Sequence, residues 1–116
     1  MAPRRLILEF GMGTSIRRQD YTAAAVRAVR DALWHNSIAL AEYYGTDRAE
    51  MRIEAEIGVA DPDAVDIGAV AAVFPYGEVT VRAVPGGLDV PHPEGGAPSV
   101  TANAIVSVSM NGEASA

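Results

Sequence analysis

Three groups of residues could take part in catalysis or ligand binding, and the first lies at the end of an expected helix. His35 is followed by Asn36 and Ser37, and Asp31 precedes it by one helical turn. A carboxylate at this spacing could orient or charge the imidazole, and a serine beside a histidine invites a nucleophilic role. The alternative is a helix end, at which His35 meets the negative end of the helix dipole and Asn36 and Ser37 bind the last carbonyls. Adjacent residues rarely point at one atom, which favours the helix end.

The second group is Gly11-Met12-Gly13, which we expect to form a turn between a strand and a helix. Its backbone N–H groups, the positive end of the helix and the nearby Arg17 and Arg18 could together hold a carboxylate or a phosphate. A lone G-x-G lacks the third glycine and the acidic partner of a dinucleotide-binding fingerprint. An ordinary tight turn beside two solvated arginines is therefore the alternative.

The third group is a polar sheet face predicted from alternation along the strands, with Ile105 among its polar residues. Its polar members are Glu9, Glu54, Glu56, Thr80, Arg82, Thr101, Asn103 and Ser107. Carboxylates brought together across strands, or across a three-fold axis, could act as acid and base, and Arg82 could anchor an anionic substrate. The alternative is cross-strand Glu–Arg pairing on a wet surface, each pair worth about 0.2–1 kcal/mol.

Tyr76, in the turn Pro75-Tyr76-Gly77-Glu78, could line a cleft between subunits or simply pack in that turn. From these groups we predict two sets of site residues. The predicted catalytic residues are Glu9, Asp31 and His35. The predicted ligand-binding residues are Gly11, Gly13, Arg27, Ser37, Tyr76, Arg82 and Asn103.

The composition of the 116-residue chain removes several kinds of chemistry. There is no cysteine, and all nine basic residues are arginine. Thiolate nucleophiles, Schiff-base lysines, P-loop lysines and Ser-Lys dyads are therefore excluded. The spacing of the two histidines offers no metal-ligand pair, so we expect no metal and no cofactor. A net charge of −6 argues against nucleic acid and anionic membranes as partners.

Hydrophobic periodicity predicts the element order β-α-β-α-β-β within one α+β domain, residues 1–110, followed by a flexible tail at 111–116. We expect strands at 5–10, 51–59, 78–84 and 100–110, helices at 21–35 and 67–74, and an additional short strand at 88–90. Two helices can cover only one face of a single-layer, mixed four-stranded sheet. The other face would be solvated in a monomer or would contact another subunit in an oligomer.

Three stretches of sequence carry a resemblance to known proteins. They are Glu9–Gly13, then Gln19-Asp20 with Thr22–Ala32 and Asn36-Ser37, and finally Pro75–Val79. On these stretches the chain is similar to the Lin-type conserved hypothetical proteins of bacteria. The element order resembles the trimeric chorismate mutases and the reactive-imine deaminases, which implies a chorismate mutase-like fold with ligands in clefts between subunits. A distant resemblance to the cyclic amide hydrolases, cyanuric acid hydrolase and barbiturase, does not extend to their Ser-Lys dyads.

We therefore expect a homo-oligomer, a trimer or a multiple of three, that binds a small polar or anionic metabolite between subunits. Its chemistry, if it is an enzyme, would be acid/base or hydrolytic. The alternative is a non-catalytic interaction or scaffold protein. No apolar run approaches the length of about 18 residues that a membrane helix needs, so we expect a cytoplasmic protein.

Overall fold

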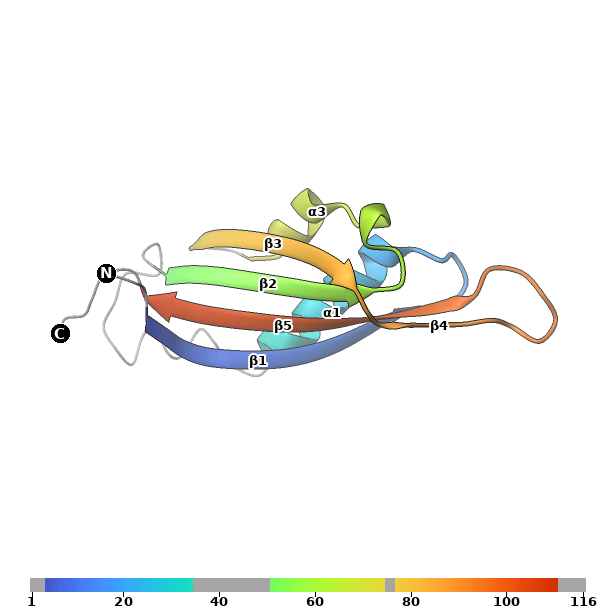
Figure 1. Ribbon diagram of the computed structural model, residues 1–116, viewed down its shortest axis with the longest axis horizontal. Helices are drawn as coiled ribbons and strands as arrows, with labels where there is room; N and C mark the ends of the chain where they lie inside the picture. Colours follow the sequence, from blue (N-terminus) through green and yellow to red (C-terminus); the bar gives the residue numbers. More distant parts are fainter. Residues whose placement is uncertain (1–3, 35–50, 75–76, 111–116) are drawn as a thin grey trace.

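The computed structural model describes residues 4–34, 51–74 and 77–110 (Figure 1). Its elements are β1 (Arg4–Ser15), α1 (Tyr21–Trp34), β2 (Met51–Val59), a 3-10 turn (Pro62–Ala64), α3 (Ile67–Ala71), β3 (Glu78–Pro85), β4 (Leu88–Val90) and β5 (Ser99–Met110). The α+β class and the predicted order are confirmed, with β4 as the additional short strand. The helix end expected at Asn36-Ser37 and the tail at 111–116 lie outside the described residues.

The strands form one mixed sheet in the order β1-β5-β2-β3. β5 is antiparallel to both β1 and β2, whereas β3 is parallel to β2. β4 pairs with β5 beyond the end of β2, so the sheet of the described residues has the four main strands expected and the additional short strand as its fifth. The chain reaches β4 through Gly87, whose φ is +64° and whose missing Cβ would lie 2.1 Å from the Thr101 carbonyl oxygen. Only glycine is readily accommodated there.

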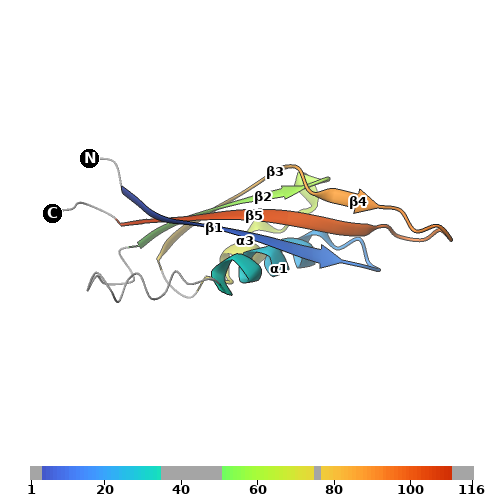
Figure 2. The same cartoon turned by 90° about the horizontal axis from the view of Figure 1, so that it is seen from below.

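The helices α1 and α3 lie on one face of the sheet, as the edge-on view in Figure 2 shows. The core between them and the sheet is built from small and β-branched side chains. Its fully buried members include Ala24, Ala25, Ala28, Val29 and Ala32 of α1, Ile57 and Val59 of β2, and Val100, Ala102, Val106 and Val108 of β5. None of the helices in the described ranges has the length and hydropathy needed to cross a membrane.

The strand β1 continues through Gly11-Met12-Gly13, so the turn expected there is wrong. A Cβ on Gly11 would lie 2.1 Å from the carbonyl oxygen of Ala28, and a Cβ on Gly13 would lie 2.3 Å from that of Ala24. The two glycines therefore let the backbone of α1 lie directly against β1. The two glycines allow the helix to pack closely on the sheet. A G-x-G pattern occurs both at such contacts and in turns, so the local sequence does not distinguish them.

The helices begin at aspartate caps and differ slightly from the predicted ranges. Asp20 accepts a hydrogen bond of 2.9 Å from the Ala23 N–H at the start of α1, and Asp66 does the same for Ala69 at 3.2 Å in α3. α3 ends at Ala71 rather than at residue 74, because the N–H groups of Val73 and Phe74 bond three residues back, to Val70 and Ala71. The two helices cover one sheet face, as predicted.

Candidate functional site

The sheet face turned away from α1 and α3 is not covered by any other described residue, and we call it the open face. Register and alternating burial place on it Leu8, Phe10, Met12 and Thr14 of β1, Arg52, Glu54 and Glu56 of β2, Glu78, Thr80 and Arg82 of β3, Leu88 and Val90 of β4, and Thr101, Asn103, Ile105 and Ser107 of β5. The assignment of β2, β3 and β5 residues to this face agrees with the sequence analysis.

Glu9 is not on the open face, and that part of the prediction is wrong. It pairs with Val106, whose side chain is fully buried under the helices. Paired residues of antiparallel strands point to the same side, so Glu9 belongs to the helix side and its neighbours Leu8 and Phe10 to the open face. Glu9 therefore does not join Glu54 and Glu56.

The β1 side of the open face is apolar. Phe10 is 61% exposed and Met12 is 60% exposed, and Phe10 pairs in register with the exposed Ile105 of β5. Leu88 and Val90 of β4 are also exposed on this face. We call Phe10, Met12 and Ile105 the apolar patch. Alternation in the other strands had indicated a polar face, and β1 does not follow that pattern.

The β3 side of the open face is polar and contains a hollow of about 230 Å³. The hollow is lined by Glu54, Ala55, Glu56, Thr80, Arg82, Ile105 and Ser107, and we call it the Arg82 hollow. The Arg82 guanidinium donates a hydrogen bond of 2.7 Å to Glu56. One guanidinium and two carboxylates therefore surround a small polar space beside Ile105.

Arg27 and Asp31 lie on α1, away from this hollow, and bind the backbone of β1. The guanidinium of Arg27 donates to the Thr14 carbonyl at 2.6 Å, and the carboxylate of Asp31 accepts from the Met12 N–H at 3.0 Å. Among the described strands β1 lies at the edge of the sheet, so these backbone groups have no partner in the strands that the structure describes. Because the Met12 N–H is already engaged, it is not free to bind an anion.

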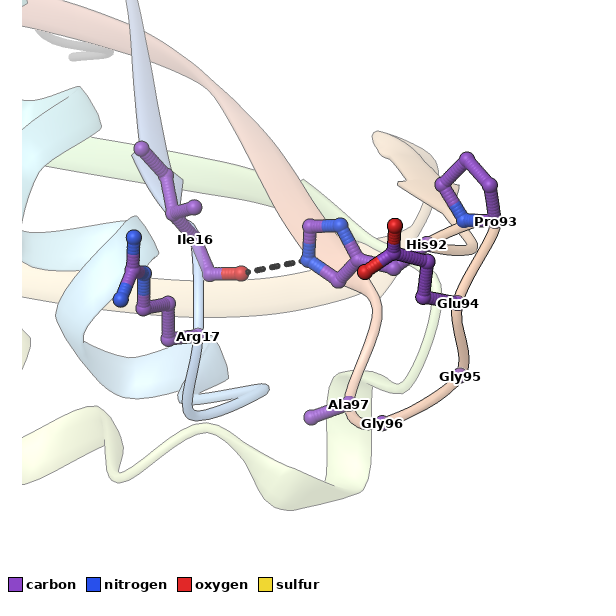
Figure 3. A pocket seen from close by; sticks show the side chains of 8 residues that line it. All are labelled: Ile16, Arg17, His92, Pro93, Glu94, Gly95, Gly96 and Ala97. Carbon is purple, nitrogen blue, oxygen red and sulfur yellow. Dashed lines mark hydrogen bonds between the residues drawn. The ribbon is translucent and has the colours of Figure 1, made fainter.

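His92, which was not among the predicted site residues, links its loop to the residue that follows β1. The ring of His92 lies against the main chain of Ile16, with Arg17, Glu94 and Ala97 around the same hollow of about 540 Å³ (Figure 3). His92 Nε2 is 3.0 Å from the Ile16 carbonyl oxygen and 3.3 Å from the hydroxyl of Ser99. The one sequence signal was the placement of His92 between two prolines.

The geometry around His92 determines what the pair with Ser99 can do. A carbonyl oxygen only accepts, so the short contact with Ile16 requires a hydrogen on Nε2 of His92. That nitrogen then has no lone pair with which to take the proton of Ser99. Since Ser99 also donates to the Ile16 carbonyl at 3.2 Å, both side chains fasten the loop rather than form a nucleophile and its base.

Tyr21 links α1 to β4 through a second polar contact. Its hydroxyl donates to Asp89 Oδ2 and accepts a hydrogen bond of 3.4 Å from Gln19. The hydrogen bond to Asp89 raises the pKa of Tyr21 above its ordinary value of 10.0, because only the protonated hydroxyl can donate it, and the negative charge of Asp89 adds to the rise. The other oxygen of Asp89, Oδ1, is buried and has no hydrogen-bond partner among the described residues.

Comparison with known proteins agrees with the resemblance seen in the sequence. A model of the Lin0512 family of conserved hypothetical proteins matches residues 5–108. The chain belongs to this family. It is also similar to the crystal structure of an FtsZ-like protein of unknown function from Nostoc punctiforme PCC 73102, with 37% identity, a TM-score of 0.85, and coverage of 97% of this chain and 99% of that one. No curated protein matches the chain.

In this Lin0512 family protein the predicted site residues divide between the two sides of the sheet. Arg82 and Asn103 lie on the open face, whereas Glu9, Gly11, Gly13, Arg27 and Asp31 lie on the helix side or at the β1 edge. His35, Ser37 and Tyr76 lie outside the described residues. Within the described ranges, no three His, Cys, Asp or Glu residues are grouped closely enough to hold a metal ion.

Proposed function

We propose that this Lin0512 family protein binds a small polar metabolite at the Arg82 hollow, between subunits of a three-fold homo-oligomer. One observation carries the proposal: a hollow with a guanidinium, two carboxylates and two hydroxyl side chains lies on a face that none of the described residues covers. The three-fold symmetry rests on the resemblance to the chorismate mutase-like trimers. The cytoplasmic location expected from the sequence is part of the same proposal.

The charges around the hollow favour one class of ligand. Arg82 could bind a carboxylate or a carbonyl, but Glu54 and Glu56 would repel a ligand that carries only negative charge. A molecule with both an acceptor group and an N–H or ammonium group can bind the guanidinium through the first and the carboxylates through the second. Amino acids, cyclic amides and imides have this combination, so the proposed ligand is polar or zwitterionic rather than simply anionic.

The size of the hollow explains why a second subunit belongs to the site. Pockets that enclose a small molecule usually measure about 300–1,000 Å³. The Arg82 hollow is smaller, at about 230 Å³, and opens onto the flat face of the sheet. A neighbouring subunit laid over it would close the space and exclude water. Catalytic roles for Glu9, Asp31 and His35 stay predictions, and neither Glu9 nor Asp31 lies on the face that holds the hollow.

A non-catalytic interaction protein is the second candidate, and the contacts of α1 favour it. Arg27 and Asp31, two of the residues predicted for the site, already bind the backbone of β1. Residues used in this way contribute to the fold and leave fewer groups for chemistry. In this case the open face would bind a protein and no metabolite.

A thermal-shift screen distinguishes the two candidates. The panel contains amino acids, cyclic amides, imides, keto acids and enamines, each tested on the wild type, Arg82→Gln and Arg30→Gln. Ligand binding raises the melting temperature by mass action. We expect at least one amide, imide or amino acid to stabilise the wild type and Arg30→Gln but not Arg82→Gln. Arg30 is exposed on α1, away from the hollow. A flat response across the panel would favour the interaction protein.

A further inference from the structure

We infer that the apolar patch of Phe10, Met12 and Ile105 is a contact surface for a second copy of this chain. The inference deepens the proposed function, on which it rests for the presence of a ligand, by naming the surface that brings a neighbour over the Arg82 hollow. Ile105 belongs both to the patch and to the wall of the hollow. A subunit seated on the patch therefore reaches the hollow directly.

The distribution of exposed apolar side chains is the first support. Among the described residues the exposed large hydrophobic side chains are Phe10, Met12, Ile16, Ile67, Leu88, Val90 and Ile105. Five of these seven lie on the open face, namely Phe10, Met12, Leu88, Val90 and Ile105. Scattered apolar residues are normal on any protein surface, but their concentration on one face is typical of an interaction site.

The charge distribution allows a second copy of the same chain to approach on this face. The whole chain carries a net charge of −6, so two copies repel one another across most of their surfaces. On the open face the described charged residues are Arg52, Arg82, Glu54, Glu56 and Glu78. Arg82 is paired with Glu56 at 2.7 Å and Arg52 with Glu78 at 3.8 Å. This face is close to neutral, and it is therefore where a second acidic copy can approach.

The area of the face also suits association between two copies. β5 has 12 residues, and at about 3.3 Å per residue it spans about 40 Å, while four strands about 4.8 Å apart span about 20 Å. Because β2 and β3 are shorter, with nine and eight residues, the four strands of the open face together cover about 650 Å². Stable protein–protein contacts bury about 600–1,000 Å² on each partner. Covering the whole of this face would therefore be sufficient for a specific complex.

The edge of the sheet next to the patch is less suited to association. A strand added beside β1 would need the backbone groups of Met12 and Thr14, which Asp31 and Arg27 already bind. Edge-to-edge pairing at this point would have to break both hydrogen bonds. Contact through the open face leaves them intact.

Sedimentation velocity at micromolar concentration tests the inference with four variants. Phe10→Asp and Ile105→Asp each place a charge in the apolar patch. Ile67→Asp is the matched control, because Ile67 is also exposed but begins α3, where an aspartate is favourable. We expect the wild type and Ile67→Asp to sediment as the same oligomer, and the patch variants to dissociate with a dissociation constant raised at least tenfold. Ile105→Thr, a smaller change, provides the same test if a charged variant does not fold.

The outcomes separate this inference from the proposed function. A monomeric wild type, or an oligomer that persists in every folded patch variant, would overturn the inference. A patch-dependent oligomer that binds no compound of the thermal-shift panel would support the contact surface and contradict the ligand site. A monomeric wild type that binds a ligand through Arg82 would support the ligand site and contradict the contact surface.

Discussion

The carboxylate of Asp31 accepts a hydrogen bond of 3.0 Å from the backbone N–H of Met12, and so a helix side chain binds the outer edge of the sheet. Arg27, one helical turn earlier, binds the Thr14 carbonyl in the same way. Edge strands expose such groups and can pair with other chains through them. The two side chains therefore stabilise the fold and protect its edge.

Asp31→Ala should lower the free energy of unfolding by about 1 kcal/mol, because the Met12 N–H keeps access to water and loses only the net value of its hydrogen bond. Hydrogen exchange measured at the Met12 amide should become faster. Arg30→Ala, an exposed change on the same helix, should leave that exchange rate unaltered. An unchanged rate in Asp31→Ala would show that the carboxylate does not bind this N–H in solution.

Gly13→Ala should destabilise the fold by about 3 kcal/mol or more. Its Cβ would lie 2.3 Å from the Ala24 carbonyl oxygen and 2.4 Å from the Ala28 nitrogen, and a backbone contact of this kind is relieved only by moving the helix. Urea unfolding measures the change. Gly68→Ala is the control, since its nearest neighbour, Asp66 Oδ1, is 3.4 Å away and alanine favours the helix. Equal stability of the two variants would contradict the close approach of α1 to β1.

Tyr21→Phe should lower the free energy of unfolding by about 1–3 kcal/mol, because Asp89 loses its hydrogen-bond donor while its other oxygen already lacks a partner among the described residues.

The raised pKa of Tyr21 also predicts that this stabilisation depends on pH. Above its ordinary pKa of 10.0 the unfolded chain releases the proton before the folded chain does, so this stabilisation is complete below pH 10 and is lost at higher pH. The stability difference between wild type and Tyr21→Phe, measured by urea unfolding, should therefore shrink above pH 10. A difference that persists unchanged to higher pH would contradict the Tyr21–Asp89 hydrogen bond.

Much of the fold could be predicted because most elements are strongly periodic. Alternation in β2, β3 and β5 identified the buried and open faces residue by residue. β1 could not be read in this way. Its apolar residues Leu6, Ile7, Leu8 and Phe10 do not alternate, and a strand read one position out of phase exchanges its two faces. Glu9 was misplaced and Phe10 overlooked for this reason.

The candidate site was harder to predict than the fold because its residues are brought together by tertiary contacts. The glycines of β1 have the composition of a turn, and only the approach of α1 explains them. The contact between His92 and Ile16 joins segments far apart in the chain. By contrast, Arg82 and Glu56 occupy matching positions in two alternating strands, and the sequence analysis did place both on one face.

The reactivity of a thiol placed on the open face measures most directly whether a second copy of the chain covers that face in solution. The chain has no cysteine, so Asn103→Cys introduces a single thiol on the open face, opposite Met12 in the register, and Arg30→Cys introduces one on the exposed side of α1. The rate of reaction with a thiol reagent is then measured in dilute and in concentrated protein. We expect at least tenfold slower reaction of Asn103→Cys in the concentrated sample and an unchanged rate for Arg30→Cys. An equal rate for Asn103→Cys at both concentrations would contradict a second copy covering the open face.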